Sequence, residues 1–348
     1  MDRVLTYAEA IHEATEQEMA RDPAVIVLGL GVDDFRGIYG TTAGLAEKFG
    51  ADRVFDTPLS EDAMTGVAIG AALGGLRPVH VHIRMDFLLL AMNQLVNMAA
   101  KMRYMFGGAA SVPLVVRAII GRSWGQGAQH SQGLQSMFMH VPGLKVVAPT
   151  TPYDAKGCLI SAIRDDDPVI FVEHRLVHAL RGPVPGGDYT VPFGRARLLE
   201  RGADVTLVGI SHMVVECLRA HRHLARVGIA AEVIDPVSLS PLDTETIVES
   251  VGRTGRLLVV DTAWLTCGAS AEIVTRVVER LQGERPLRVA RLGFAPVTCP
   301  PTPALERLFY PDGPRIAAAA HRLVREDAPA WQPPPEDSPE IVAFRGPF

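Results

Sequence analysis

Short continuous apolar runs, each followed by a segment of helical character, constrain the fold of this chain more than any other feature. Residues 24–29, Ala-Val-Ile-Val-Leu-Gly, are typical of a strand that is buried on both faces. Similar runs occur at residues 112–117, 144–149, 168–173, 204–209, 231–236 and 256–261. Because strands and helices alternate, the sequence predicts an α/β fold in which mostly parallel sheets carry helices on both faces.

The length of the chain predicts two such domains. A chain of 348 residues exceeds the usual size of a single hydrophobic core. Residues 181–194 are rich in proline and glycine, so we expect a linker between a domain of residues 1–180 and a second of residues 195–325. Residues 326–348 are rich in proline and charge, and we expect them to form an unpacked tail.

Composition excludes several classes of function. The net charge of −5 offers no basic footprint for nucleic acid or anionic membranes. No apolar run approaches the roughly 18 residues of a membrane-spanning helix, and the acidic first 20 residues are unlike a signal or transit peptide. The four cysteines form no Cys-x-x-Cys pair, which fits a reducing cytoplasm and argues against zinc. We therefore expect a cytoplasmic protein that binds neither nucleic acid nor membranes.

Residues 56–61, Asp-Thr-Pro-Leu-Ser-Glu, lead into a helix of mostly small and apolar residues. Ser60 is expected to cap this helix, with Glu61 in its first turn. Glycines recur every four residues from 66 to 74, and each costs about 1 kcal/mol of helix propensity. We therefore expect this face to pack closely against another helix. The proton affinity of Glu61 would rise in such an apolar setting, or Glu61 simply complements the helix dipole.

The loop of residues 121–132 follows a predicted strand and contains the polar cluster Gln-His-Ser-Gln. Loops after strands carry much of the chemistry of α/β proteins, and a histidine there can exchange a proton near neutral pH. His130 is therefore a candidate catalytic residue, and a surface histidine is the alternative. His80 and His82 share one face of another predicted strand, but without a third ligand we expect no metal there.

Several motifs between residues 4 and 325 occur in the order and spacing of one family. They are Asp-Thr-Pro-Leu-Ser-Glu at 56–61, Ala-Gln-His-Ser-Gln at 128–132, Pro-Gly-Leu-Lys-Val-Val-Ala-Pro at 142–149, Asp-Ala-Lys-Gly at 154–157, Ser-Ala-Ile-Arg-Asp-Asp-Asp-Pro-Val at 161–169 and Asp-Val-Thr-Leu-Val-Gly at 204–209. Together they resemble the beta subunit of thiamine diphosphate-dependent 2-oxoacid dehydrogenases, the decarboxylating component of pyruvate, branched-chain and acetoin dehydrogenase complexes. The resemblance implies a transketolase-like pyrimidine-binding domain followed by a transketolase C-terminal domain.

The resemblance implies thiamine diphosphate as the cofactor and assigns Glu61, Leu59 and Phe87 to its binding. The Glu61 carboxyl group is implied to hydrogen-bond the pyrimidine ring, so that the aminopyrimidine can remove the thiazolium proton. Phe87 is implied to stack on the aminopyrimidine, unless it is only a core residue at a helix start. His130 is implied to handle the 2-oxoacid and to pass the acyl group to a lipoyl arm.

The resemblance also implies metal ions. A potassium ion is implied on the main-chain oxygens of Leu114, Ala162, Ile163, Asp165 and Asp167. Asp167 stands where asparagine is common, which ligation by carbonyl oxygens tolerates. The alternative for residues 165–167 is a simple polar turn. The chain lacks the Gly-Asp-Gly that, with a later Asn, holds magnesium and the diphosphate in complete enzymes. We therefore expect an alpha subunit to supply that half of the site in an alpha2-beta2 heterotetramer, which alone is active.

The predicted reaction is oxidative decarboxylation of a small 2-oxoacid with acyl transfer to a lipoyl acceptor, and a lipoyl acyltransferase core is a further expected partner. The alternatives are a split transketolase-like subunit that uses a non-lipoyl acceptor, and a non-catalytic scaffold subunit. Three departures from the family weaken any choice of substrate, but not of reaction class. Residues 30–31, Leu-Gly, replace an acidic pair, Arg122 and Trp124 replace small residues, and residues 261–264 lack a common glutamate.

Overall fold

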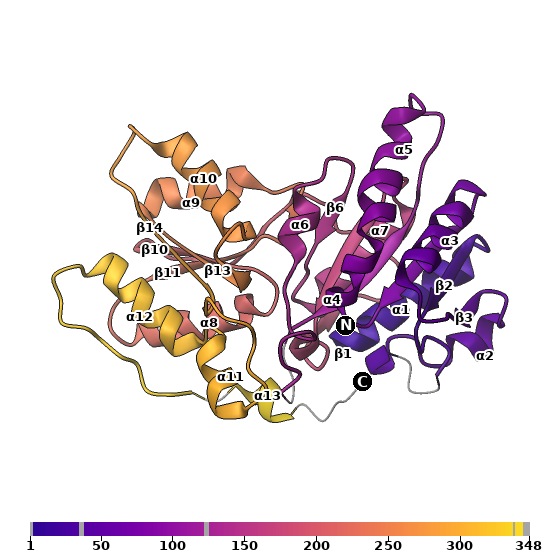
Figure 1. Cartoon of the computed structure of the whole chain (residues 1–348). Coiled ribbons are helices and arrows are strands. Elements are labelled where there is room, and N and C mark those ends of the chain that lie inside the picture. The colour runs from indigo at the N-terminus through magenta and orange to yellow at the C-terminus, as the bar shows by residue number, and fades with distance from the viewer. Residues whose placement is uncertain (1–2, 35–37, 122–124, 337, 344–348) are drawn as a thin grey trace. The chain divides into compact units, whose positions relative to one another are not determined.

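The computed structural model describes residues 3–34, 38–121, 125–336 and 338–343, which form two compact units (Figure 1). Unit 1 comprises residues 1–123, 130–193 and 343–348, and unit 2 comprises residues 124–129 and 194–342. Each unit contains a largely parallel sheet with helices on both faces, so the predicted fold class is confirmed. Within the described ranges, no helix has both the length and the apolarity to cross a membrane.

Unit 1 is built on a parallel sheet in which neighbouring strands follow the order β6-β7-β5-β4-β2-β3. The strands are β2 (Val25–Gly29), β3 (Val54–Asp56), β4 (Arg77–His82), β5 (Val115–Ile120), β6 (Lys145–Val147) and β7 (Val169–His174). Nearly all residues of β2, β4, β5 and β7 are buried, as their continuous apolar sequences predicted.

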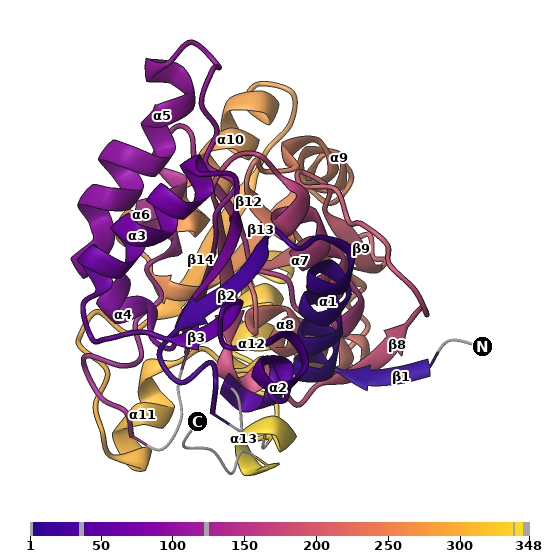
Figure 2. The ribbon, with the colours of Figure 1, turned by 90° about the vertical axis from the view of Figure 1, so that its right-hand side faces the viewer.

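Helices cover both faces of this sheet (Figure 2). Helices α1 (Tyr7–Arg21) and α7 (Pro152–Arg164) pack on each other over one face. Helix α3 (Glu61–Leu73) lies over the other face, next to the helical segment of residues 85–105. The shorter helices of unit 1 are α2 (Leu45–Phe49), α6 (Gln135–Met139) and the single turns η1 (Ile38–Gly40) and η4 (Arg175–Val177).

The helical segment of residues 85–105 is continuous but irregular. It consists of α4 (Met85–Leu88), the 3-10 turn η2 (Leu89–Ala91), the π-helical segment η3 (Gln94–Ala99) and α5 (Ala100–Met105). Short π-helical segments are rare and frequently occur at functional sites. The residues at the junctions keep right-handed helical dihedral angles, so the helix continues through them. The pattern of apolar residues in the sequence does not reveal where the hydrogen bonding of the helix changes.

The predicted linker of residues 181–194 packs along unit 1. Its first residues form β8 (Arg181–Val184), which pairs antiparallel with β1 (Arg3–Thr6) (Figure 2). Further along, the backbone N–H of Val191 donates to the carbonyl of Gly157 in α7 at 3.1 Å. A Cβ atom at Gly157 would lie 2.5 Å from Val191 Cγ2, so this close approach requires glycine.

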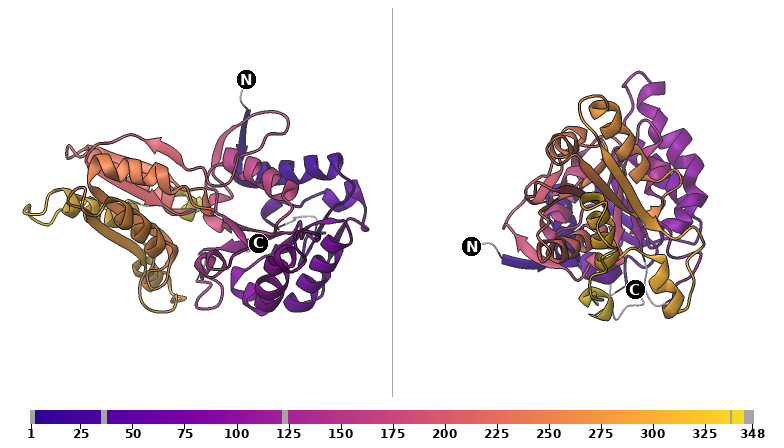
Figure 3. Two further views of the ribbon diagram at one scale, coloured as in Figure 1. Left: turned by 90° about the horizontal axis from the view of Figure 1, so that it is seen from above. Right: turned by 90° about the vertical axis from the view of Figure 1, so that its left-hand side faces the viewer.

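Unit 2 contains a five-stranded sheet in the order β14-β13-β10-β11-β9, in which only the edge strand β9 is antiparallel. Helices α8 and α12 pack over one face, and α9 and α10 over the other (Figures 1 and 3). The elements of unit 2 are β9 (Arg197–Glu200), β10 (Val205–Gly209), α8 (Met213–Ala225), β11 (Ala231–Asp235), β12 (Ser238–Ser240), α9 (Thr244–Thr254), β13 (Arg256–Trp264), α10 (Ala269–Leu281), β14 (Arg288–Phe294), α11 (Pro303–Phe309), α12 (Gly313–Val324) and α13 (Pro339–Ala343).

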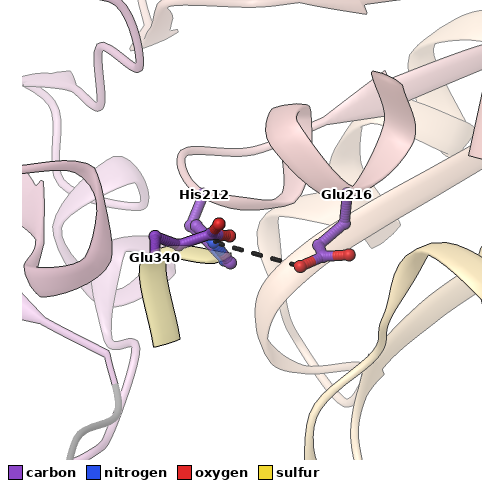
Figure 4. A group of neighbouring side chains, drawn as sticks. All are labelled: His212, Glu216 and Glu340. Atoms are coloured by element: carbon purple, nitrogen blue, oxygen red, sulfur yellow. Dashed lines mark hydrogen bonds and ion pairs between the residues drawn. The ribbon is translucent and has the colours of Figure 1, made fainter. Parts of the chain in front are cut away.

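The prediction that residues 326–348 form an unpacked tail is wrong for its described residues. Trp331 packs against the core of unit 2, and α13 carries a buried Glu340. The Glu340 carboxylate accepts a hydrogen bond from His212 Nε2 at 2.7 Å (Figure 4). It accepts another from Arg219 Nη1 at 2.8 Å. The charges of this segment are complementary to charges at the start of α8, which composition alone does not reveal.

Candidate active site

Three of the predicted site residues follow three strands of the unit 1 sheet. Glu61 is the first residue of α3, which follows β3, and Phe87 lies in α4 after β4. His130 lies in the loop after β5. Since β3, β4 and β5 belong to one parallel sheet, the loops at their carboxyl ends lie at one edge, where α/β proteins bind ligands.

The structure brings Phe87 and His130 into contact. Their ring centroids are 5.2 Å apart and the ring planes meet at 82°, which is an edge-to-face arrangement. Both side chains are half-buried. Phe87 is therefore not sealed in the core, and its ring retains surface on which a ligand can stack.

Glu61 is half-buried, and within the described residues its carboxylate has no hydrogen-bond or ion-pair partner. Leu59, two residues earlier, is 79% exposed. Ser60 holds the N-cap position of α3, but its hydroxyl lies 3.3 Å from Asp62 Oδ1 and does not bond the helix backbone. The predicted capping bond of Ser60 is therefore absent, and the amino end of α3 is left without a side-chain cap.

Arg175 fixes both ends of the loop that carries His130. Its Nη1 atom donates to the carbonyl of His130 at 2.9 Å and to that of Gly121 at 2.5 Å. Gly121 has a φ of +91°, and a Cβ atom there would lie 2.2 Å from the ring of His174, so only glycine fits. Sequence reasoning missed Arg175, although its position directly after β7, at the same edge of the sheet, was a signal.

A second anchor of this loop comes from Asp86, which sequence reasoning also missed. Asp86 Oδ1 accepts hydrogen bonds from Gln132 Nε2 at 2.8 Å and from the Gln132 backbone N–H at 3.2 Å. The side chain of Asp86 is 6% exposed, and its Oδ2 atom has no partner among the described residues. Burial raises the pKa of Asp86, and the hydrogen bonds from Gln132 partly oppose that shift.

The charges around His130 favour its neutral form. Burial lowers the pKa of His130, and the cations of Arg84 and Arg175 lower it further, while Asp86 acts in the opposite direction. Arg84 is buried directly before α4, and burial lowers the pKa of its guanidinium group. A neutral imidazole can accept a proton or a hydrogen bond from a bound substrate.

Arg77 engages two of the carbonyl groups that the sequence assigned to potassium. Its Nη1 atom donates to the carbonyl of Ile163 at 3.0 Å and to that of Asp165 at 3.1 Å. The carbonyls of Leu114 and Ala162 each accept one backbone hydrogen bond. The acidic side chains of this loop are also paired, in Arg77–Asp166, Lys145–Asp165, Lys145–Asp167 and Arg103–Asp167. The fit to potassium is therefore partial, because a protein cation already satisfies part of the site.

His80 and His82 lie on one buried face of β4, with ring centroids 4.2 Å apart. Burial lowers the pKa of His80 to about 4, so both rings are neutral at physiological pH. No group of three possible metal ligands within the described residues includes this pair. The described residues thus offer no third ligand for a metal ion at these histidines.

One group of three possible metal ligands occurs among the described residues, and Figure 4 shows it in unit 2. It consists of His212, Glu216 and Glu340. Arg219 Nη1 donates to Glu216 Oε1 at 2.6 Å and to Glu340 Oε1 at 2.8 Å. A guanidinium group thus neutralises the carboxylates, and the cluster is a buried ion-pair network that joins α13 to α8.

The departures from the family pattern are only partly described by the structure. Arg122 and Trp124 lie outside the described residues. Gly31, which stands in the place of an acidic residue, donates its backbone N–H to Asp56 Oδ1 at 2.7 Å. Asp261 is buried and accepts a hydrogen bond from the backbone N–H of Ser270 at 3.2 Å, so it supports the start of α10.

Comparison with known proteins identifies both domains and the family. Residues 3–178 match the pyrimidine-binding domain of transketolase, and residues 194–316 match the transketolase C-terminal domain. The chain is 46% identical over 341 residues to the beta subunit of the acetoin:2,6-dichlorophenolindophenol oxidoreductase of Cupriavidus necator, covering 93% of this chain and 99% of that protein. The chain belongs to the beta-subunit family of the thiamine diphosphate-dependent 2-oxoacid dehydrogenases.

Other members of this beta-subunit family are similar over the same extent. The beta subunit of the pyruvate dehydrogenase E1 component of Porphyra purpurea is 41% identical over 324 residues, covering 93% of this chain and 98% of the relative. The 2-oxoisovalerate dehydrogenase beta subunit of Bacillus subtilis is 39% identical over 322 residues, covering 92% and 98%. A solved split-gene transketolase, described as an inactive beta4 tetramer, supports the fold alone, with a TM-score of 0.76, 24% identity and coverage of 92% and 98%.

Proposed function

We propose that this chain is the catalytic beta subunit of an enzyme that decarboxylates a small 2-oxoacid and transfers the acyl group to a lipoyl acceptor. The observation that carries this proposal is the carboxylate of Glu61, which has no partner among the described residues and lies at the sheet edge that also carries Phe87 and His130. A half-buried carboxylate without a partner is costly unless a ligand completes its hydrogen bonding.

Glu61, Leu59 and Phe87 form the proposed cofactor-binding set. The Glu61 carboxyl group would hold a ring nitrogen of the aminopyrimidine, while exposed Leu59 and half-buried Phe87 offer apolar surface to the ring. Thiamine diphosphate, when bound, supplies the electron sink that decarboxylation requires. The carboxylate, the apolar surface and the position at the sheet edge all fit this cofactor.

His130 is the second proposed catalytic residue. Its ring lies against Phe87, and therefore beside the surface assigned to the aminopyrimidine. Burial and the cations of Arg84 and Arg175 lower the pKa of His130, which favours a neutral imidazole that can hydrogen-bond the oxoacid and accept a proton during acyl transfer.

An alpha subunit is the proposed partner in an alpha2-beta2 heterotetramer, and it would hold Mg²⁺ and the diphosphate. Apolar side chains are exposed on α3 and on the neighbouring segments η2, η3 and α5, and glycines of α3 are exposed beside them. These side chains are Val67, Leu73, Leu89, Leu90, Met98 and Tyr104. We call this set the α3 face. Contiguous apolar surface of this kind marks a site of protein association.

Three finer points belong to the same proposal. A lipoyl acyltransferase core is the proposed acceptor of the acyl group from the assembled enzyme.

The free cysteines, of which Cys158, Cys217 and Cys299 are buried, suit a cytoplasmic location. The proposed potassium site is the loop of Leu114, Ala162, Ile163, Asp165 and Asp167, where the ion would compete with the Arg77 guanidinium for carbonyl oxygens.

The similarity to an acetoin oxidoreductase subunit favours acetoin as a second candidate substrate. Acetoin carries no carboxylate, so its cleavage would release no carbon dioxide. A screen should therefore measure both carbon dioxide release and reduction of the dye 2,6-dichlorophenolindophenol.

The test is co-expression with an alpha subunit of the same family, followed by assay with thiamine diphosphate, Mg²⁺, a range of 2-oxoacids and acetoin. We expect turnover of at least one substrate, and we expect Glu61→Gln to abolish it, together with proton exchange at the thiazolium carbon. Asp62→Asn, at the exposed neighbouring position, is the control and should remain active. Wild-type proton exchange in the Glu61→Gln enzyme would remove Glu61 from this role.

A further inference from the structure

We infer that Asp86 is a positioning residue, which holds the segment of residues 130–134 so that His130 faces Phe87. The inference rests on the role proposed above for His130. Asp86 positions His130 through its hydrogen bonds to Gln132.

Three consecutive residues of α4 bind alternate residues of the His130 segment. Phe87 contacts the ring of His130, and Asp86 Oδ1 accepts both hydrogen bonds from Gln132. Met85 Sδ accepts the backbone N–H of Leu134 at 3.4 Å. The middle contact is the strongest of the three, because a carboxylate oxygen receives two N–H groups of one residue.

The Gln132 contact restrains the backbone as well as a side chain. The hydrogen bond from the backbone N–H of Gln132 fixes the peptide plane two residues after His130. The hydrogen bond from Gln132 Nε2 prevents the side chain from turning away. On the other side of the segment, Arg175 Nη1 holds the carbonyl of His130 at 2.9 Å. The histidine is thus held between an anionic and a cationic anchor.

The charge of Asp86 is not required for anchoring alone. A neutral amide oxygen could accept the same two bonds, yet a buried carboxylate is present and leaves Oδ2 without a partner among the described residues. The charged groups that face His130 are Arg84, Arg175 and Asp86, and Asp86 is the anion among them. The second effect of Asp86 is therefore to oppose the two arginines, which keeps the pKa of His130 closer to its ordinary value.

Two substitutions separate anchoring from charge. Asp86→Asn keeps an oxygen for Gln132 but removes the charge, so we expect near wild-type kcat at high pH and an acid limb of kcat/KM displaced to lower pH. Asp86→Leu removes the anchor, so we expect kcat to fall on the order of 100-fold, as for a misplaced catalytic group. Gln132→Leu should reproduce that loss, and the double variant should add little to it.

The experiment uses the assembled enzyme and its best substrate, with assembly checked by size-exclusion chromatography and Asp52→Leu as an exposed control. Cofactor activation, measured as proton exchange at the thiazolium carbon, should stay unchanged in every variant. A Gln132→Leu enzyme with wild-type kcat would overturn the inference even if Asp86→Leu does not fold. An unshifted pH profile in Asp86→Asn would overturn the charge effect. If His130→Ala is itself fully active, the proposed function fails instead.

Discussion

At the scale of single residues, burial decides the charge state of His80 and His82. Burial lowers the pKa of His80 to about 4, while an unfolded histidine titrates near 6.5. Below about pH 6.5 the unfolded chain therefore binds protons that the folded chain does not, and stability falls as the pH drops toward 4. His80 alone should account for about 2 kcal/mol between pH 7.5 and pH 5, because the unfolded histidine is mostly protonated below about pH 6 and each pH unit there is worth about 1.4 kcal/mol.

The His80→Leu variant tests this dependence. Its free energy of unfolding, measured in urea at pH 7.5 and pH 5, should change less with pH than that of the wild type. The exposed position His140 provides the control, since His140→Leu should retain the wild-type pH dependence. Parallel pH profiles for wild type and His80→Leu would contradict the assignment.

Sequence reasoning proposed those candidate site residues whose signal is local. Glu61 stands at a helix start after a strand, and His130 stands in a polar loop after a strand. In both cases a side chain that can exchange a proton occurs in a local sequence context that is typical of active sites. Asp86 and Arg175 were missed because their role is to contact residues 46 and 45 positions away, respectively. The order of strands in the sheet creates those contacts, and no local pattern encodes it.

At the scale of elements, the turn between α7 and β7 links Arg77 to the proposed potassium site. If the Arg77 guanidinium and potassium compete for the carbonyls of Ile163 and Asp165, then Arg77→Met should bind the ion more tightly. We expect the increase in Tm caused by 100 mM KCl over 100 mM NaCl to be larger in Arg77→Met than in wild type, because the ion binds only the folded state. Arg53→Met, which removes another arginine that donates to backbone carbonyls, is the control. An equal response to potassium in wild type and Arg77→Met would exclude the competition.

Elements that are buried on both faces were predictable, and elements defined by their neighbours were not. The apolar runs located β2, β7, β10, β11 and β13 to within a few residues. The strand β14 was missed because Arg288 and Arg291 interrupt its apolar residues, and most of its residues are exposed or only partly buried. The segment α13 was missed because its docking depends on His212 and Arg219, which lie more than 100 positions earlier in the chain.

At the scale of the whole molecule, the α3 face is an apolar surface that the described residues leave exposed. We expect Val67→Asp and Leu90→Asp to prevent association with the alpha subunit without unfolding either unit, because both side chains are exposed. Leu305→Asp, at an exposed apolar position in α11 of unit 2, should assemble normally. Size-exclusion chromatography of co-expressed subunits measures the outcome, and a Val67→Asp heterotetramer of wild-type stability would refute this location of the interface.

The buried ion pair of Arg219 and Glu340 has a consequence for synthesis. The two residues are 121 positions apart, so α8 leaves the ribosome long before its anionic partner exists. Until then, Glu216 is the remaining carboxylate among the described residues that pairs with the Arg219 guanidinium, and His212 lacks the Glu340 carboxylate to which it hydrogen-bonds. In a nascent unit 2, the side chains of His212 and Arg219 would therefore remain hydrated, and α13 would pack on α8 only after residue 340 has been added. Its last folding step is thus tied to translation and not only to the sequence of its core.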